Sequence, residues 1–195
     1  MSIYKAKRVR FLSSRELEDA TREMAELSSV PMAIAGGYAM QIYGSDRYTT
    51  DLDLLALRAP ADLPKLRDLS FGGFATKTSL GTPVDIIVRD DDFKKLYRDA
   101  VRTARPAPGL PLRVVSAGHL IAMKMAAGRA KDDLDLDFLL PRMTAKELAD
   151  AREVVVRHLG GAFAGRKFDA RLAEARWRYS RDPNERRRRR HVGKR

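Results

Sequence analysis

The sequence has no cysteine, only three histidines and no long apolar run. Without cysteine, the chain can form neither a disulfide framework nor a thiolate metal site. The histidines, His119, His158 and His191, are too scattered to give the spacing of zinc ligands. No apolar stretch reaches the roughly 18 residues of a membrane-spanning helix, and the N-terminal segment lacks the apolar centre of a secretory signal. We therefore expect a soluble, cytoplasmic protein that does not enter a membrane.

Positive charge is unevenly placed along the 195-residue chain, whose formal net charge is +12. Residues 166–195 hold 13 Lys or Arg against 4 Asp or Glu, whereas the rest of the chain is close to balance. Arg186–Arg190 are five consecutive arginines with nothing to bury, so we expect a disordered tail over 183–195. Such a run attracts a polyanion, nucleic acid first. The alternative is a tail that only keeps the protein in solution.

The first half of the chain mixes helical and strand patterns, and the second half is mostly helical. Ser13 and Glu16 have capping-box spacing and open a helix that runs to about Ser29. Residues 51–57 alternate acidic and apolar side chains, as a strand does. The proline- and glycine-rich segment 105–111 is the best candidate for a linker. The other elements that we expect are strands at 32–35 and 114–115, a hairpin of 74–79 and 83–88, and helices at 38–43, 62–69, 91–102, 117–127, 131–140, 145–159 and 168–178.

Three features of the first half carry chemistry. Gly36 and Gly37 join a strand to a helix, where glycine lets a ligand approach the backbone and the helix start offers N–H groups to phosphate. The alternative is a plain turn. Asp51 and Asp53 project from the same side of one strand, and two such carboxylates repel unless a cation such as Mg²⁺ lies between them. The alternative is a solvated polar face.

The third feature is Asp85, which lies in the apolar strand segment VDIIV. A carboxylate in such a strand needs a partner, and a metal shared with Asp51 and Asp53 would supply one. The alternative is a carboxylate at a strand end that accepts backbone N–H groups.

In their order along the chain, these features resemble the nucleotidyltransferase superfamily with a polymerase-β-like fold. The likeness runs from about Ala33 to Leu140. A helical lysine, Lys124, followed by the KDDLDL segment from Lys131, is similar to the KDxxDL pattern of the AbiEii/MenT-type nucleotidyltransferase toxins. Many members of the superfamily have Gly-Ser after the first strand, whereas this chain has Gly-Gly, which also occurs in the toxin branch.

The resemblance implies an α/β fold, with a small mixed sheet in a nucleotidyltransferase core over residues 1–110 and a helical C-terminal part over 111–182. It implies an enzyme that uses Mg²⁺, as two ions, to add nucleotides from an NTP to an RNA 3′ end. For the toxin branch the RNA is the tRNA acceptor stem, and the addition blocks translation. A toxin also implies a cognate antitoxin as a partner.

The resemblance also assigns roles to individual residues. Asp51, Asp53 and Asp85 would hold the metal ions, and Asp85 would help to remove the proton of the attacking hydroxyl. Lys124 would contact phosphate, and the KDxxDL register selects Asp132 and Asp135, over Asp133 and Asp137, to orient Lys124 or the substrate. The residues expected to hold the nucleotide are Gly36, Gly37, Arg47 and Thr49.

Other functions remain open from the sequence. A nucleotidyltransferase that modifies an antibiotic would favour an acidic acceptor pocket, against which the basic C-terminal end argues. A transferase that modifies a protein hydroxyl is a further alternative. A non-catalytic RNA-binding or antitoxin module is the last, and the complete set of three aspartates argues against it.

Overall fold

The computed structural model describes residues 10–181. The expected arginine-rich tail at 183–195 lies outside the described residues. Within residues 10–181, no helix combines the length and the apolar character that crossing a membrane requires.

The described residues divide into two compact units. The first unit comprises residues 10–90 together with Ala104–Val114, and the second comprises Asp91–Thr103 together with residues 115–181. The boundary that we expected near residue 110 falls within the segment Ala104–Val114, which returns to the first unit. The helix expected at 91–102 belongs to the second unit, so the chain passes between the units three times.

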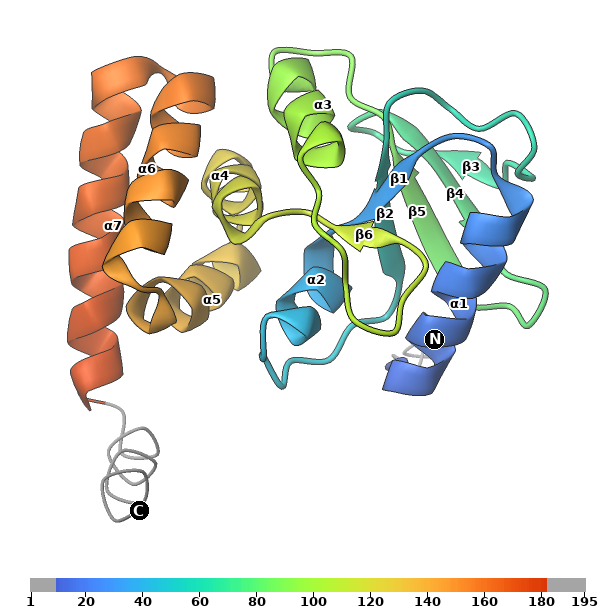
Figure 1. Cartoon of the computed structure of the whole chain (residues 1–195), viewed down its shortest axis with the longest axis horizontal. Coiled ribbons are helices and arrows are strands. Elements are labelled where there is room, and N and C mark those ends of the chain that lie inside the picture. The colour runs from blue at the N-terminus through green and yellow to red at the C-terminus, as the bar shows by residue number, and fades with distance from the viewer. Residues whose placement is uncertain (1–9, 182–195) are drawn as a thin grey trace, which may run out of the picture. The chain divides into compact units, whose positions relative to one another are not determined.

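The first unit is built on a six-stranded mixed sheet with the order β3-β4-β5-β2-β1-β6 (Figure 1). β2 pairs in parallel with β5, and β1 pairs in parallel with β6, while the other neighbours are antiparallel. The strands are β1 (Met32–Ile34), β2 (Leu52–Ala56), β3 (Arg67–Asp68), β4 (Gly73–Lys77), β5 (Pro83–Ile87) and β6 (Arg113–Val114).

The parallel pair of β2 and β5 is central to the sheet and sets the register of the acidic residues. Asp53 lies opposite Asp85, and the next pair is Leu54 opposite Ile86. Apart from the exposed Pro83, the apolar residues of both strands are buried, whereas the two aspartates are partly exposed. The strand pairing therefore places two carboxylates side by side at a point where their neighbours form the core.

Two helices complete the first unit: α1 (Ser14–Leu27) and α2 (Gly36–Ile42). The predicted capping box is present, with the Glu16 backbone N–H donating to Ser13 Oγ at 3.3 Å and the Ser13 N–H donating to Glu16 Oε2 at 2.9 Å. α1 buries Leu17 and Met24 on one face, so the amphipathic pattern of the sequence is confirmed.

The helix expected at 62–69 is wrong. The segment contains a turn and the short strand β3, and the N–H of Leu66 donates to the carbonyl of Ala75 at 2.9 Å. Pro64 explains the difference, because proline disfavours the helical conformation in the residue before it and supplies no N–H to a helix. Pairing with β4 then satisfies the backbone groups of the segment.

The second unit is helical. Its elements are α3 (Lys94–Arg102), α4 (Ala117–Ala127), α5 (Ala130–Leu139), the 3₁₀ turn η1 (Leu140–Arg142), α6 (Ala145–Leu159) and α7 (Gly161–Arg181). α6 and α7 lie side by side (Figure 1). α4 packs closely on α6 at Gly118, where an added Cβ would lie only 3.1 Å from Ala151 Cα. The predicted bounds of α4 and α6 are confirmed, and α7 begins seven residues before the expected Phe168.

Candidate active site

At the start of α2, side chains from other segments lie directly against the backbone of Gly36 and Gly37. Gly36 has φ +55°, and a Cβ added there would lie 1.7 Å from Asp53 Oδ2. A Cβ added at Gly37 would lie 2.5 Å from Thr49 Oγ1. The two glycines therefore let a carboxylate and a hydroxyl lie directly against the backbone, which no larger residue would allow.

The loop that precedes β2 is tied to this glycine pair. The hydroxyl of Thr49 donates to the carbonyl and to Oδ1 of Asp51, at 3.1 and 3.2 Å. A guanidinium nitrogen of Arg47 lies 3.5 Å from the Cβ position of Gly37. The amide of Gln41, on α2, donates to the carbonyl of Arg47 at 3.0 Å. Arg47 and Thr49 are thus held beside the glycines, where the sequence predicted them to assist in nucleotide binding.

The carboxylates of the first unit influence one another. Burial raises the pKa of Asp85, and the negative charge of Asp51 raises it further, while Arg67, 3.9 Å away, opposes the rise. Asp51 and Asp85 also line one cavity of about 540 Å³, together with Arg67 and Lys77. Two negative charges held close together at the edge of a cavity repel each other, and a bound cation would relieve this repulsion.

The fit of these residues to a metal ion can be judged from their chemistry and spacing. Carboxylate oxygens are the ligands that Mg²⁺ prefers, and the mutual repulsion of Asp51 and Asp85 suits a cation. Among residues 10–181, no three His, Cys, Asp or Glu side chains stand as a ready-formed metal site. The donor type and charge therefore fit Mg²⁺, while a full ligand set would need the three aspartate side chains to turn toward one another.

In the second unit, the sequence-predicted Lys124, Asp132 and Asp135 come together. The ammonium of Lys124 forms an ion pair with Asp135 and lies 3.5 Å from Asp132 Oδ1. Arg129 Nε donates to Asp132 Oδ2 at 2.6 Å. The side chains of Lys124, Asp132 and Asp135 are at most 6% exposed, so one cation and two anions form a buried cluster, and the exposed Arg129 contacts it from its edge.

The net effect on Asp132 is a lowered pKa. Burial alone would raise the pKa, but the hydrogen bonds from Arg129 and the positive charge of Lys124 outweigh it. Asp132 is therefore held as a carboxylate at neutral pH and fixes both cations.

The other two aspartates of α5 face a different partner. Asp137 accepts from Arg171 Nη1 at 2.8 Å and from Arg178 Nη1 at 2.7 Å. Asp133 Oδ1 lies 3.6 Å from Arg171 Nε. Because residues three or four apart share one helix face, α5 directs Asp132 and Asp135 toward Lys124 and the other pair toward α7.

The sequence analysis did not identify two cations that lie beside the site aspartates, Arg67 and Arg129. Arg67 lies on β3, in a segment expected to be helical, so nothing in the sequence indicated that it would lie beside Asp85. Arg129 could have been found, because it stands three residues before Asp132, in the position of a helix N-cap. The structure thus groups Gly36, Gly37, Arg47, Thr49, Asp51, Asp53 and Asp85 in the first unit and Lys124, Asp132 and Asp135 in the second.

Comparison with known proteins identifies the fold. No protein-family model matches the sequence, and no curated protein sequence matches it. Among solved structures, an antigenic nucleotidyltransferase-like protein from Paracoccidioides brasiliensis matches with a TM-score of 0.50 and 18% identity, over 88% of this chain and 93% of that one. This likeness shows that the mixed sheet and helices form a nucleotidyltransferase-like fold.

Two other solved structures match at lower TM-scores. A candidate nucleotidyltransferase from H. pylori gives 0.45 with 16% identity, over 87% of this chain and 98% of that one. The antibiotic-resistance factor ANT(2″)-Ia gives 0.36 with 18% identity, over 85% of this chain and 90% of that one.

Proposed function

We propose that this chain is a Mg²⁺-dependent nucleotidyltransferase that adds nucleotides from an NTP to the 3′ end of an RNA, with the tRNA acceptor stem as the first candidate. The observation that supports transfer is the approach of Asp53 to Gly36 and of Thr49 to Gly37, with Asp85 opposite Asp53 in the sheet. This arrangement sits on a nucleotidyltransferase-like fold. The choice of RNA rests on the resemblance to the toxins and on the net charge of +12.

The nucleotide-holding role falls to the start of α2. In this proposal the triphosphate binds along the open backbone at Gly36 and Gly37, where side chains would block its approach. Arg47 supplies positive charge beside it, and Thr49 holds the Asp51 side chain in place through its hydroxyl. Positioning and charge neutralisation are the main requirements of phosphoryl and nucleotidyl transfer.

In this proposal Asp51, Asp53 and Asp85 activate the attacking 3′ hydroxyl of the RNA. The 3′ oxygen of the RNA forms a bond to the α-phosphorus, the bond from that phosphorus to the bridging oxygen breaks, and pyrophosphate leaves. In this proposal the Asp85 carboxylate accepts the hydroxyl proton. Mg²⁺ held by Asp51, Asp53 and Asp85 would supply positive charge to the phosphates and to the attacking oxygen.

We assign Lys124 to the phosphate charge of the substrate, with Asp132 and Asp135 as its positioning residues. The ammonium is buried and paired, so reaching a phosphate would require it to exchange a carboxylate partner for a phosphate oxygen. Lys124→Arg keeps the charge but changes its shape. It should lower the transfer rate while the protein remains folded, and an unchanged rate would leave the cluster with a structural role only.

The experiment that tests the proposed acceptor uses each of the four NTPs, labelled at the α-phosphorus, with Mg²⁺ and total tRNA. Labelled tRNA would support the proposal and identify the nucleotide. Parallel reactions contain an aminoglycoside or a mixture of cytosolic proteins in place of RNA. Label found only on the drug or on protein would contradict RNA as the acceptor and retain the transferase. No label on any acceptor would contradict nucleotidyl transfer itself.

A further inference from the structure

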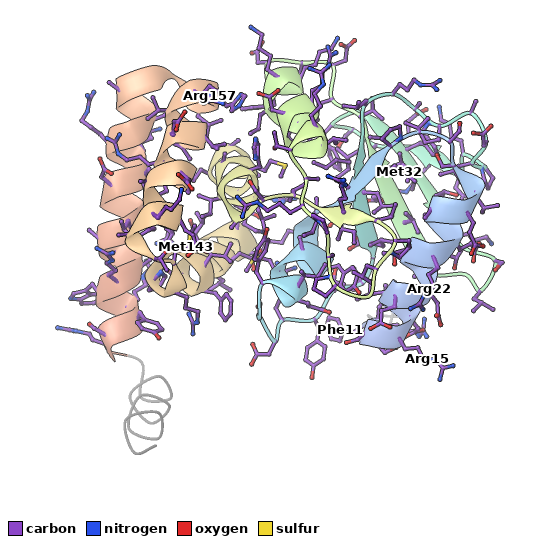
Figure 2. The ribbon with its side chains drawn as sticks, viewed as in Figure 1. Phe11, Arg15, Arg22, Met32, Met143 and Arg157 are labelled. Atoms are coloured by element: carbon purple, nitrogen blue, oxygen red, sulfur yellow. The ribbon has the colours of Figure 1, made fainter. Side chains whose placement is uncertain are left out.

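The second unit contains a cavity that the proposed chemistry does not use. The cavity has a volume of about 420 Å³ and lies where the helices α3 and α6 approach each other. Figure 2 labels one of its residues, Arg157, which lies in the last turn of α6. Its lining consists of four permanent cations, one histidine and one carboxylate: Lys95, Arg98, Arg102, Arg157, His158 and Asp99.

Three of the cations stand on one face of α3 without a partner. Lys95, Arg98 and Arg102 are spaced three and four residues apart, so their side chains lie along one side of the helix. All three are exposed, and none of their side chains forms an ion pair or a hydrogen bond with another described residue. Like charges at this spacing repel one another, and an anion bound between them would remove the repulsion.

His158 adds a buried donor to the same cavity. Its side chain is 5% exposed, and its Nε2 is buried without a hydrogen-bond partner among the described residues. Asp99 Oδ2 lies 3.3 Å away and forms an ion pair with the ring when the ring is protonated, but the two atoms are not in hydrogen-bond geometry. A buried nitrogen that lacks a hydrogen-bond partner is costly. Because Nε2 is buried beside Asp99, an oxygen atom in the cavity reaches it only when the Asp99 carboxylate turns aside.

The balance of charge decides the class of ligand. Asp99 is the one carboxylate of the lining, and Arg157 is already paired with Glu153. Lys95, Arg98 and Arg102 remain available for a ligand that carries negative charge on several oxygens at once. A phosphate group meets this description, since its oxygens can accept from several donors that converge on it. The cavity is larger than one phosphate, so it has room for an attached sugar or a second phosphate.

We propose that this cavity binds a phosphate group through Lys95, Arg98, Arg102 and the Nε2–H of His158. Two sources share this chemistry: a free phosphate ion and the phosphodiester backbone of a single-stranded nucleic acid. The site lies wholly within the second unit and is independent of the proposed transfer reaction, so it stands or fails separately from that reaction.

The test compares Arg98→Gln with the matched control Arg176→Gln in the full chain. Both residues are exposed arginines on helices, and neither side chain has a partner within residues 10–181. Arg176, on α7, does not line the cavity. One experiment titrates inorganic phosphate and follows the His158 ring signals by NMR. The other measures the affinity for a fluorescent oligouridine strand at several salt concentrations.

We expect Arg98→Gln to weaken binding about tenfold in at least one experiment, and Arg176→Gln to change it less than twofold. If the source is a nucleic-acid backbone, Arg98→Gln also makes the plot of log affinity against log salt concentration shallower. The slope should fall in magnitude by about 0.7, the value for one phosphate contact to a single strand. Loss of phosphate binding alone assigns the site to the free ion. Equal effects of the two substitutions in both experiments, or no binding of either inorganic phosphate or the oligouridine strand, would overturn the proposal.

Discussion

Gly36→Ala places a methyl group where the carboxylate of Asp53 already lies. The backbone there has φ +55°, which costs a residue with a side chain about 1–2 kcal/mol. The new Cβ would lie 1.7 Å from Asp53 Oδ2 and 2.8 Å from Asp53 Cβ. Rotation of the carboxylate cannot relieve the second contact, so crowding adds about 1–3 kcal/mol. We expect a total loss of about 2–5 kcal/mol in the free energy of unfolding.

Gly44→Ala is the matched control, because Gly44 has φ +87° and nothing within 4 Å of its Cβ position. It carries the backbone strain without the crowding. Urea denaturation followed by circular dichroism should therefore rank Gly36→Ala below Gly44→Ala by about 1–3 kcal/mol. Adding Asp53→Ala to the Gly36→Ala protein should recover part of this difference. Equal stabilities of the two alanine variants would refute the close approach of Asp53 to the backbone at Gly36.

Two further predictions concern the buried cluster of the second unit. Lys124→Met leaves Asp132 and Asp135 buried with less positive charge. Loss of one partner of a buried pair should lower the free energy of unfolding by about 3–5 kcal/mol. Urea denaturation measures this loss, and a value under about 1 kcal/mol would contradict the burial of the pair. The lowered pKa of Asp132 means that the unfolded chain takes up this proton at a higher pH than the folded chain does. The stability that the carboxylate contributes is therefore complete above about pH 4 and is lost as the pH falls through the folded pKa. Asp132→Asn should flatten the fall in unfolding free energy below pH 4, and an unchanged acid limb would contradict the lowered pKa.

Local signals in the sequence predicted most of the elements. The Ser13–Glu16 spacing fixed the start of α1, and the alternation in residues 51–57 identified β2. Such patterns depend only on neighbours along the chain. The segment 62–69 was mispredicted because its conformation depends on pairing with β4 and on Pro64, which outweigh its apolar spacing.

The candidate site was predictable residue by residue but not as an arrangement. The sequence placed Asp51 and Asp53 on one strand, whereas in the structure Asp51 directly precedes β2. The sequence also could not show that β5 would pair with β2 and bring Asp85 opposite Asp53. That pairing joins residues about 30 positions apart, beyond the reach of any local pattern. Arg67 entered the site by the same route, through a strand that the sequence did not reveal.

The four aspartates of α5 illustrate the opposite case. Their spacing alone divides them between two helix faces, and the KDxxDL register selected Asp132 and Asp135. The structure places these two at Lys124 and the other two at the arginines of α7. A helix fixes the direction of its side chains, so here a local pattern determined a tertiary contact.

The most direct test of metal-dependent nucleotidyl transfer compares Asp53→Asn with Asp92→Asn. Asp92 is an exposed aspartate outside the candidate site. Asp92→Asn removes one negative charge, as Asp53→Asn does. The assay measures transfer of α-labelled nucleotide to tRNA with Mg²⁺ and again after chelation by EDTA. We predict that the wild-type and Asp92→Asn proteins transfer label only with Mg²⁺, and that Asp53→Asn, folded by circular dichroism, loses at least about a hundredfold in rate. Equal rates for the two variants, or transfer that continues in EDTA, would contradict the account.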